Sequence, residues 1–244
     1  MNNWYHKIAM TLPDFKNLPE EEFYPTGLES IDERMIEQKA KEESEKHPGW
    51  EYIDSGSYGA AFVNPDNPSE LVKYTTHEEE YIAINQVLNL QKEKGVNSLP
   101  GLIPIKNIEI ISSGLYKINT EKMEQLNETE IKLILNLSSF NEFWALQQDV
   151  RSSTQNIEEV PLKLKEILEQ YKKRDIKFIE FTRVIEDYAK HYKQDIYEIL
   201  AKFFSLYINL NNLGFKHWDL TIYNIGKDKN GNYVVFDLGG LELL

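Results

Sequence analysis

The spacing of apolar residues along the chain changes near residue 127. Before that point, short apolar runs between turn-forming residues predict one helix over 78–90 and strands over 50–53, 60–63, 71–74, 102–111 and 115–123. After it, apolar residues recur with the 3.6-residue period of an α-helix over 128–145, 162–171, 178–192 and 196–213. This order predicts an α+β protein whose strands come first and whose helices come second.

Turn-forming residues support this division. Asp54–Gly59 carries two glycines between two predicted strands, and Asn64–Pro68 is a turn by composition. Near the end of the sequence, the pair Asn230-Gly231 lies between the short apolar runs 225–227 and 233–236, which is a strong signal for a β-hairpin.

The first residues follow no period, and we interpret residues 1–29 as an irregular arm. Ser30 and Glu33 have the spacing of a capping box, which predicts a helix that Pro48 and Gly49 end. We therefore expect three parts: an arm and a helix over 1–48, a strand-rich part over 49–126 and a helical part over 127–244.

Composition excludes several classes of function. The 244 residues include 27 Lys and Arg against 40 Asp and Glu, and the net charge of −13 argues against binding nucleic acid through its phosphates. The absence of cysteine excludes disulfides, thiolate zinc sites and a cysteine nucleophile. No apolar run approaches the roughly 20 residues of a membrane span, and the N-terminus lacks the apolar core of a signal peptide. We expect a cytoplasmic protein with no nucleic-acid or membrane partner.

The strongest candidate chemistry lies near the end of the sequence. Asp219 and Asn224 are five positions apart in the segment after the last predicted helix, and Asp237 follows thirteen residues later, after the predicted hairpin. A hairpin of this length returns the chain beside its start, where oxygen-bearing side chains could hold a hard cation and orient a hydroxyl. Turn chemistry explains the same residues equally well, so this stretch alone leaves both interpretations open.

Taken with the glycine turn at Asp54–Gly59 and with Lys73 on the third predicted strand, the sequence resembles the protein-kinase-like superfamily. The resemblance runs from about Trp50 to Gly240, and the motifs stand in the family's order. It implies a bilobal fold, with a five-stranded antiparallel N-lobe that carries one helix and a reduced helical C-lobe.

The resemblance also implies catalytic roles. Asp219 would accept or orient the proton of the acceptor hydroxyl, and Asn224 and Asp237 would ligate Mg²⁺ at the ATP phosphates. Lys73 would pair with those phosphates, and a glutamate of the following helix would hold it. We expect that glutamate to be Glu80, with Glu79 as the alternative.

The same resemblance implies a nucleotide site. The phosphates would lie under the glycine turn and the adenine beside a hinge that follows the fifth strand. Besides Lys73 and Glu80, the residues expected to contact ATP are Gly56, Ser57, Tyr58, Gly59, Ala61, Met123, Glu124 and Leu126.

Several positions depart from the family pattern. Asp54 replaces the first glycine of the loop, Trp218 an arginine, Thr221 a lysine and Leu238 a phenylalanine. The sequence also ends at Leu244 without a peptide-docking segment. We therefore expect a compact kinase that activation-loop phosphorylation does not control, and we expect His217 to be a structural hydrogen-bonding residue.

These observations predict an ATP- and Mg²⁺-dependent phosphotransferase that acts on a protein Ser/Thr hydroxyl, including its own. Two alternatives stay open. One is a small-molecule kinase of the same fold, and the other is a nucleotide-binding pseudokinase that acts through a partner.

Overall fold

The computed structural model describes residues 38, 41–42, 45–46, 49–56, 59–112, 114–192, 195–218 and 220–244, without the side chains of residues 54–56. The expected arm over 1–29 and the capping box at Ser30 and Glu33 lie outside the described residues. Within the expected first helix, residues 38, 41–42 and 45 are helical, and Gln38 Nε2 donates a hydrogen bond to Glu42 Oε1 at 3.1 Å.

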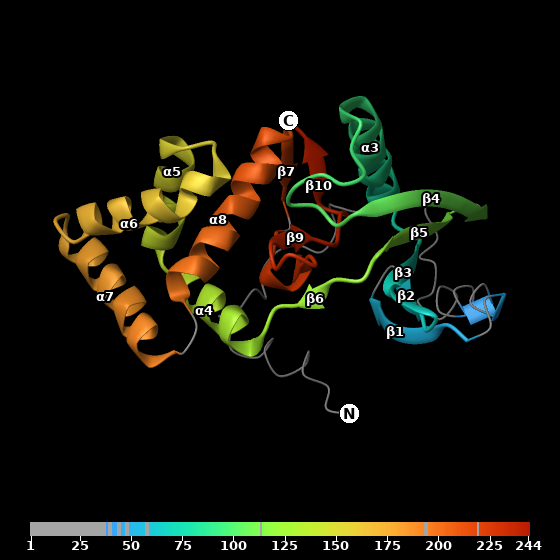
Figure 1. Cartoon of the computed structure of the whole chain (residues 1–244), viewed down its shortest axis with the longest axis horizontal. Helices are drawn as coiled ribbons and strands as arrows, with labels where there is room; N and C mark the ends of the chain where they lie inside the picture. The colour runs from blue at the N-terminus through green and yellow to red at the C-terminus, as the bar shows by residue number, and fades with distance from the viewer. Residues whose placement is uncertain are drawn as a thin grey trace, which may run out of the picture. The chain divides into compact units, whose positions relative to one another are not determined.

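The strand-rich part forms a five-stranded antiparallel sheet with the order β1-β2-β3-β5-β4 (Figure 1). Its strands are β1 (Glu51–Gly56), β2 (Gly59–Asn64), β3 (Asn67–Thr75), β4 (Ile105–Ser112) and β5 (Leu115–Glu121). Helix α3 (Glu78–Lys94) connects β3 to β4 and packs against β4. The α+β class and the five-stranded antiparallel sheet are thus confirmed.

Several strand boundaries differ from the prediction by a few residues, among them the starts of β3 and β4. Strand β3 begins at Asn67 because only Pro65 and Asp66 form the turn before it. Strand β4 begins at Ile105 rather than at Leu102, which instead forms an isolated parallel bridge with Val235.

The alternation of side chains gives the sheet two different faces. On one face, a small cluster contains Ala60, Phe62, Val72, Tyr74 and Leu115. The intervening residues point to the other face, where Lys73 lies between its cross-strand neighbours Ala61 and Ile118. Ile118 belongs to the main core together with residues of α3. Lys73 therefore lies on the face of the sheet that is directed toward α3 and the main core.

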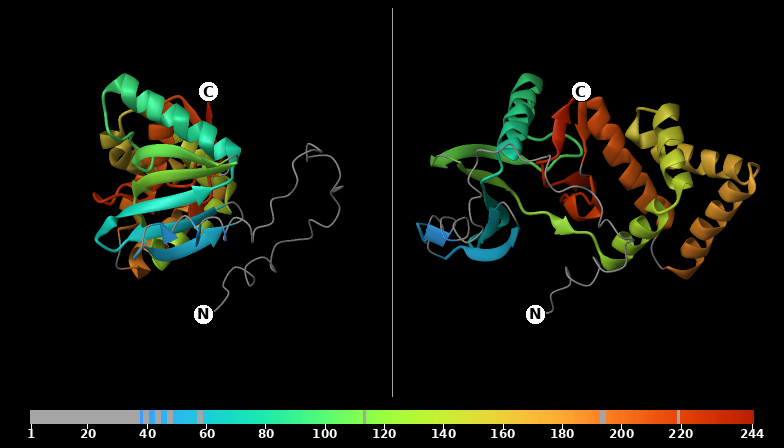
Figure 2. Two further views of the ribbon diagram at one scale, coloured as in Figure 1. Left: turned by 90° about the vertical axis from the view of Figure 1, so that its right-hand side faces the viewer. Right: turned by 180° about the vertical axis from the view of Figure 1, so that it is seen from behind.

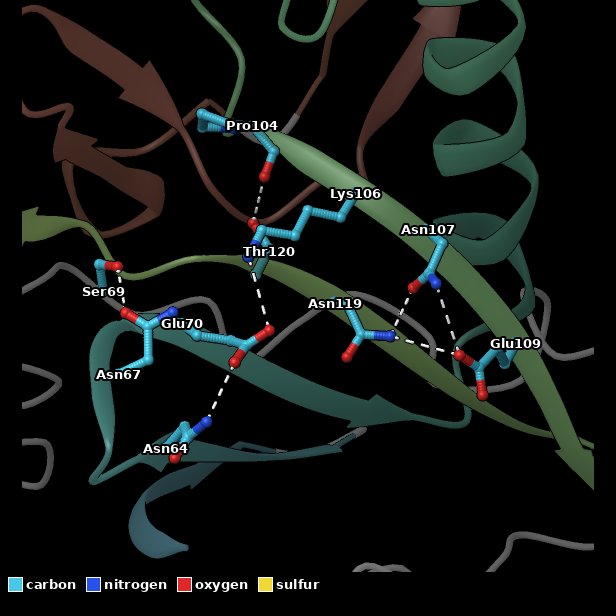
Figure 3. Close-up of polar contacts among 10 residues, drawn as sticks. All are labelled: Asn64, Asn67, Ser69, Glu70, Pro104, Lys106, Asn107, Glu109, Asn119 and Thr120. Carbon is cyan, nitrogen blue, oxygen red and sulfur yellow. Dashed lines mark hydrogen bonds and ion pairs between the residues drawn. The ribbon is translucent and has the colours of Figure 1, made fainter.

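Polar side-chain contacts connect strands of this sheet (Figure 3). Glu70 accepts a hydrogen bond from Asn64 at 3.1 Å and lies 3.5 Å from Lys106 Nζ, so its carboxylate links β2, β3 and β4. The hydrogen bond from Asn64 lowers the pKa of Glu70 most, and the charge of Lys106 adds to this against the opposing effect of burial. Thr120 donates to the backbone oxygen of Pro104 at 2.7 Å, which joins β5 to the start of β4.

Five further helices follow, so the described residues from Glu78 onward contain six α-helices. They are α4 (Glu128–Ser138), α5 (Asn141–Ser153), α6 (Val160–Tyr171), α7 (Ile176–His191) and α8 (Ile196–Asn212). Helix α8 lies among the others in Figures 1 and 2 and buries apolar residues along most of its length. Among the described residues, every helix is too short or too polar to cross a lipid bilayer.

The prediction of a single helix over 128–145 is wrong, because the helix is interrupted at Ser139 and Phe140. The hydroxyls of Ser138 and Ser139 donate to the backbone oxygens of Leu135 and Asn136, which ends the helical ladder locally. Phe140 then takes an extended backbone conformation and packs against the main core.

The last part of the chain folds as short strands. The predicted hairpin is present as β8 (Ile225–Lys227) and β9 (Tyr233–Val235), with Gly231 at a φ of 76° in its turn. The two-residue strand β6 (Glu124–Gln125) pairs with β8, and β7 (Phe215–His217) pairs with β10 (Leu241–Leu243). These strands lie between the sheet and the helices in the right-hand view of Figure 2.

Candidate functional site

An ion-pair cluster connects the sheet, helix α3 and the segment after β9. Lys73 Nζ on β3 donates to Glu80 Oε1 at 2.6 Å and lies 3.8 Å from Asp237 Oδ1. Glu80 lies in the first turn of α3 and is 3% exposed. The structure therefore pairs Lys73 with Glu80, whereas Glu79 lies 3.7 Å from the ring of His77.

The two carboxylates of the cluster favour the charged form of Lys73. Burial opposes the charged ammonium and is the largest single influence, but the attraction of Glu80 and of Asp237 and the hydrogen bond to Glu80 together exceed it, so the pKa of Lys73 is raised. Lys73 is thus a permanent cation held between two carboxylates. Such a cation can bind an anionic ligand without any change of protonation.

Asp237 is oriented by two hydrogen bonds. Its backbone oxygen accepts from Nε2 of His217 at 2.8 Å, and its Oδ1 accepts from the backbone N–H of Gly239 at 3.2 Å. Because a carbonyl can only accept, Nε2 is the ring nitrogen of His217 that carries a proton. Nearly half of the Asp237 side chain, 44%, stays exposed, so an external ligand can reach its carboxylate.

The hairpin brings Asn224 beside Asp237. Ile225 pairs with Val235, and the backbone N–H of Phe236 donates to the backbone oxygen of Asn224 at 3.0 Å, so Asn224 lies one position across from Asp237. An amide oxygen and a half-exposed carboxylate fit Mg²⁺, which takes few protein ligands and completes its shell with phosphate and water oxygens. Among the described residues, no group of three or more histidine and acidic side chains could hold a metal.

Gly239 sets the distance between this segment and α3. A Cβ at Gly239 would lie 2.6 Å from Nδ1 of His77, the residue that precedes α3, and 3.4 Å from Oδ1 of Asp237. A glycine at position 239 therefore allows the His77 ring to lie this close to the segment, whereas the distance to Asp237 would be an ordinary contact. Sequence reasoning missed His77, and no motif in the sequence marks it.

Packing within the sheet, without any ligand, explains one glycine of the turn at Asp54–Gly59. Strand β1 ends at Gly56, which pairs with Gly59 at the start of β2. A Cβ at Gly59 would lie only 2.1 Å from the backbone oxygen of Tyr74, so close packing of β2 on β3 already requires a glycine there. Ser57 and Tyr58 lie outside the described residues, as does Asp219.

The expected hinge corresponds to β6 and the residues beside it. Glu124 and Gln125 pair with Lys227 and Gly226 on β8. Adjacent residues of a strand direct their backbone groups to opposite edges, so one of the two directs its groups away from β8, where a ligand can bind.

The side chains of this segment differ in exposure. Met123 is partly buried against the main core and Glu124 is exposed. Leu126 is 6% exposed, and its side chain belongs to the main core. Its expected contact with adenine is through backbone groups and stays a prediction.

A groove of about 390 Å³ borders the cluster between α3 and β10. Trp218 lines it with 59% of its surface exposed, together with Glu79 and Ile82 of α3 and Gly239. Trp218 thus shares this surface groove with Gly239, and its backbone N–H donates to the oxygen of Gly240 at 3.0 Å.

The described site residues therefore form two groups. Lys73, Glu80 and Asp237 come together at the junction of β3, α3 and the hairpin, with Ala61 beside Lys73. The backbone of Asn224 pairs with that of Phe236, the neighbour of Asp237. Met123 and Glu124 belong to the strand that pairs with the same hairpin. Compared with models of known protein families and with curated proteins, the chain shows no significant match to either.

Proposed function

We propose that this protein is an ATP- and Mg²⁺-dependent phosphotransferase with a protein-kinase-like bilobal fold. The observation that carries the proposal is the position of Lys73 Nζ, 2.6 Å from Glu80 and 3.8 Å from Asp237. A permanent cation beside a half-exposed carboxylate is the arrangement that a nucleotide triphosphate with its divalent cation requires.

The surrounding elements support the same proposal. The sheet and α3 supply Lys73 and Glu80, whereas the hairpin after α8 supplies Asn224 and Asp237. Segment 122–127 is the covalent connection from β5 to α4 and pairs with the hairpin through β6. A nucleotide between sheet and hairpin would have phosphate-binding groups from both and backbone donors and acceptors from β6.

Each residue then has a defined role. Lys73 binds phosphate oxygens and Glu80 holds its ammonium in place. Asn224 and Asp237 hold Mg²⁺, which when bound neutralises charge on the phosphates. Asp219 takes the proton of the acceptor hydroxyl as the new O–P bond forms, and ADP leaves with the electron pair of the broken P–O bond. The acceptor we propose is a protein Ser/Thr hydroxyl, including one on the protein itself.

The test is transfer of labelled γ-phosphate in the presence of Mg²⁺ to the protein itself, to a protein pool and to a metabolite pool. The wild-type protein is expected to transfer the phosphate. The transfer rates of K73M and D237N are expected to fall by at least about 100-fold, since each substitution removes a charge that acts on the transferred phosphate. K106M is the matched control for K73M, because Lys106 is also a sheet lysine paired with a glutamate, Glu70, at 3.5 Å. K106M should keep its activity.

The outcomes separate the alternatives. Transfer only to metabolites would replace the protein acceptor by a small molecule. Binding of Mg²⁺-ATP without any transfer would favour a pseudokinase. Failure of the wild-type protein to bind Mg²⁺-ATP at all would refute the proposed function.

A further inference from the structure

A buried carboxylate joins α4 to both strands of the hairpin. Glu130, at the third position of α4, is 5% exposed. Its Oε2 accepts from the backbone N–H of Asn127 at 2.8 Å and lies 2.8 Å from Lys227 Nζ, and its Oε1 accepts from the hydroxyl of Tyr233 at 2.8 Å. We call this group the Glu130 clamp; it consists of Asn127, Glu130, Lys227 and Tyr233.

The Glu130 carboxylate contacts both residues of one cross-strand pair of the hairpin. Lys227 of β8 and Tyr233 of β9 lie directly opposite each other, so a single carboxylate holds both strands at the same level. The Lys227 side chain is 13% exposed and Tyr233 is 2% exposed, which keeps water away from the contacts. Burial and the neighbouring charge of Glu130 raise the pKa of Tyr233, so its hydroxyl stays protonated and donates.

The other end of the same hairpin carries the candidate metal ligands. Asn224 is three residues before Lys227, and Asp237 is four residues after Tyr233. At roughly 3.3 Å per extended residue they lie about 10 Å and about 13 Å along the chain from that pair. Between the two ends, β6 lies so close to β8 that a Cβ at Gly226 would approach Met123 Cβ to 3.0 Å. The hairpin is therefore held by α4 at its turn end and by β6 along β8.

We infer that Glu130 is a positioning residue that sets the separation of Asn224 and Asp237 for a divalent cation bound with a nucleotide. This inference rests on the proposed function. A buried ion pair contributes little net stability compared with apolar packing, because desolvation offsets the attraction, and it can instead specify one geometry. Here the ion pair would specify the position of a hairpin whose end must present two oxygen ligands at a fixed spacing.

The test removes one hydrogen bond of the clamp and measures Mn²⁺ binding directly. The hydroxyl of Tyr233 is deleted in Y233F, whereas Lys227 and Asn127 keep their contacts with Glu130. The matched control is Y171F, since the hydroxyl of the fully buried Tyr171 donates to the Asp149 carboxylate at 2.9 Å, between α6 and α5. Each variant loses one tyrosine-to-carboxylate hydrogen bond, but only Y233F alters the hairpin.

Mn²⁺ titrations in the presence of a non-hydrolysable ATP analogue are followed by electron paramagnetic resonance, and melting temperatures are recorded in parallel. Both variants should lose a few degrees of melting temperature, as expected for one hydrogen bond in a protein of this size. Y233F should also bind Mn²⁺ at least about threefold more weakly, at the lower end of what outer-shell substitutions do to metal affinity. Y171F should bind Mn²⁺ as the wild type does.

Equal Mn²⁺ affinity of Y233F, Y171F and wild type would overturn the positioning role while leaving the proposed function intact. Absence of Mn²⁺-nucleotide binding by the wild type would overturn both. If Y233F does not fold, E130D replaces it, because aspartate keeps the charge but withdraws the carboxylate by one methylene. A weaker Mn²⁺ affinity of E130D supports the inference, and an unchanged affinity contradicts it.

Discussion

Nε2 of His217 donates a hydrogen bond to the backbone oxygen of Asp237 at 2.8 Å. The donor stands at the end of β7 and the acceptor twenty residues later, after the hairpin. The bond therefore fixes the main chain of Asp237, whereas Lys73 and Gly239 act on its side chain.

Replacing this histidine should affect activity more than stability. H217F keeps an aromatic ring but loses the donor, so the free energy of unfolding should fall by about 1 kcal/mol and phosphate transfer by about tenfold, as Asp237 is less well oriented. Transfer assays and urea unfolding measure the two effects. H191F is the control, because Nδ1 of the exposed His191 makes the same kind of contact with the backbone oxygen of Asp187 at 2.6 Å. Equal activity losses in both variants would contradict the role of His217.

Two adjacent glutamates of α3 should behave differently. E80Q removes the buried charge that holds Lys73 at 2.6 Å, so we expect transfer to fall by about 10- to 100-fold, a loss of roughly 1.4–2.7 kcal/mol of transition-state stabilisation. E79Q removes a charge of the same kind whose side chain is 68% exposed, and its activity should stay close to that of the wild type. Steady-state kinetics at saturating ATP compare the two. A similar loss in E79Q would refute the assignment of Glu80.

The contact between Gly239 and His77 predicts a non-additive pair of substitutions. G239A places a methyl group 2.6 Å from the His77 ring, and overpacking of this kind costs about 1–3 kcal/mol. The double variant H77A/G239A removes the ring that the methyl group meets, so it should be more stable than the sum of the single variants predicts. Urea unfolding of the wild type and the three variants gives the coupling energy. A coupling energy near zero would show that the contact is not made.

Glu70 should contribute to stability in a pH-dependent way. Its hydrogen bond from Asn64, assisted by Lys106, lowers its pKa in the folded protein. The stabilisation is therefore fully present above the ordinary glutamate pKa of about 4.3 and is lost as the pH falls through the lower folded value. We expect E70Q to melt below the wild type at pH 7 and to approach it near pH 3. The exposed Glu93 supplies the control variant E93Q. A difference between E70Q and wild type that does not change with pH would contradict this explanation.

Much of the fold follows from periodicity. The helices over 160–212 and the strands of the sheet were predictable because their apolar spacing continues for several turns or alternations, and Asn230-Gly231 marks its hairpin by turn chemistry. The break at Ser139 was not predictable from apolar spacing, since it depends on the hydroxyls of Ser138 and Ser139 and on the packing of Phe140 against the core.

The candidate site was predictable only in part. Lys73, Glu80, Asn224 and Asp237 could be proposed from motif order, but their approach depends on pairings between distant segments. Strands β6 and β10 have two and three residues, which is too short for any periodic signal. The Glu130 clamp was missed for a related reason. An acidic residue three positions after Asn127 has the pattern of an ordinary capping box, and nothing local indicates a lysine and a tyrosine from a hairpin about 100 residues away.

The pairing of β7 with β10 has a thermodynamic consequence for the segment between them. His217 lies opposite Leu241, so the chain enters and leaves the hairpin region through the same two-stranded sheet. The entropy of closing this loop is lost when the protein folds, not when a ligand binds. A ligand that binds this region, such as the proposed nucleotide with its cation, would therefore meet a loop whose ends are already joined, and more of its contact energy would remain available as affinity.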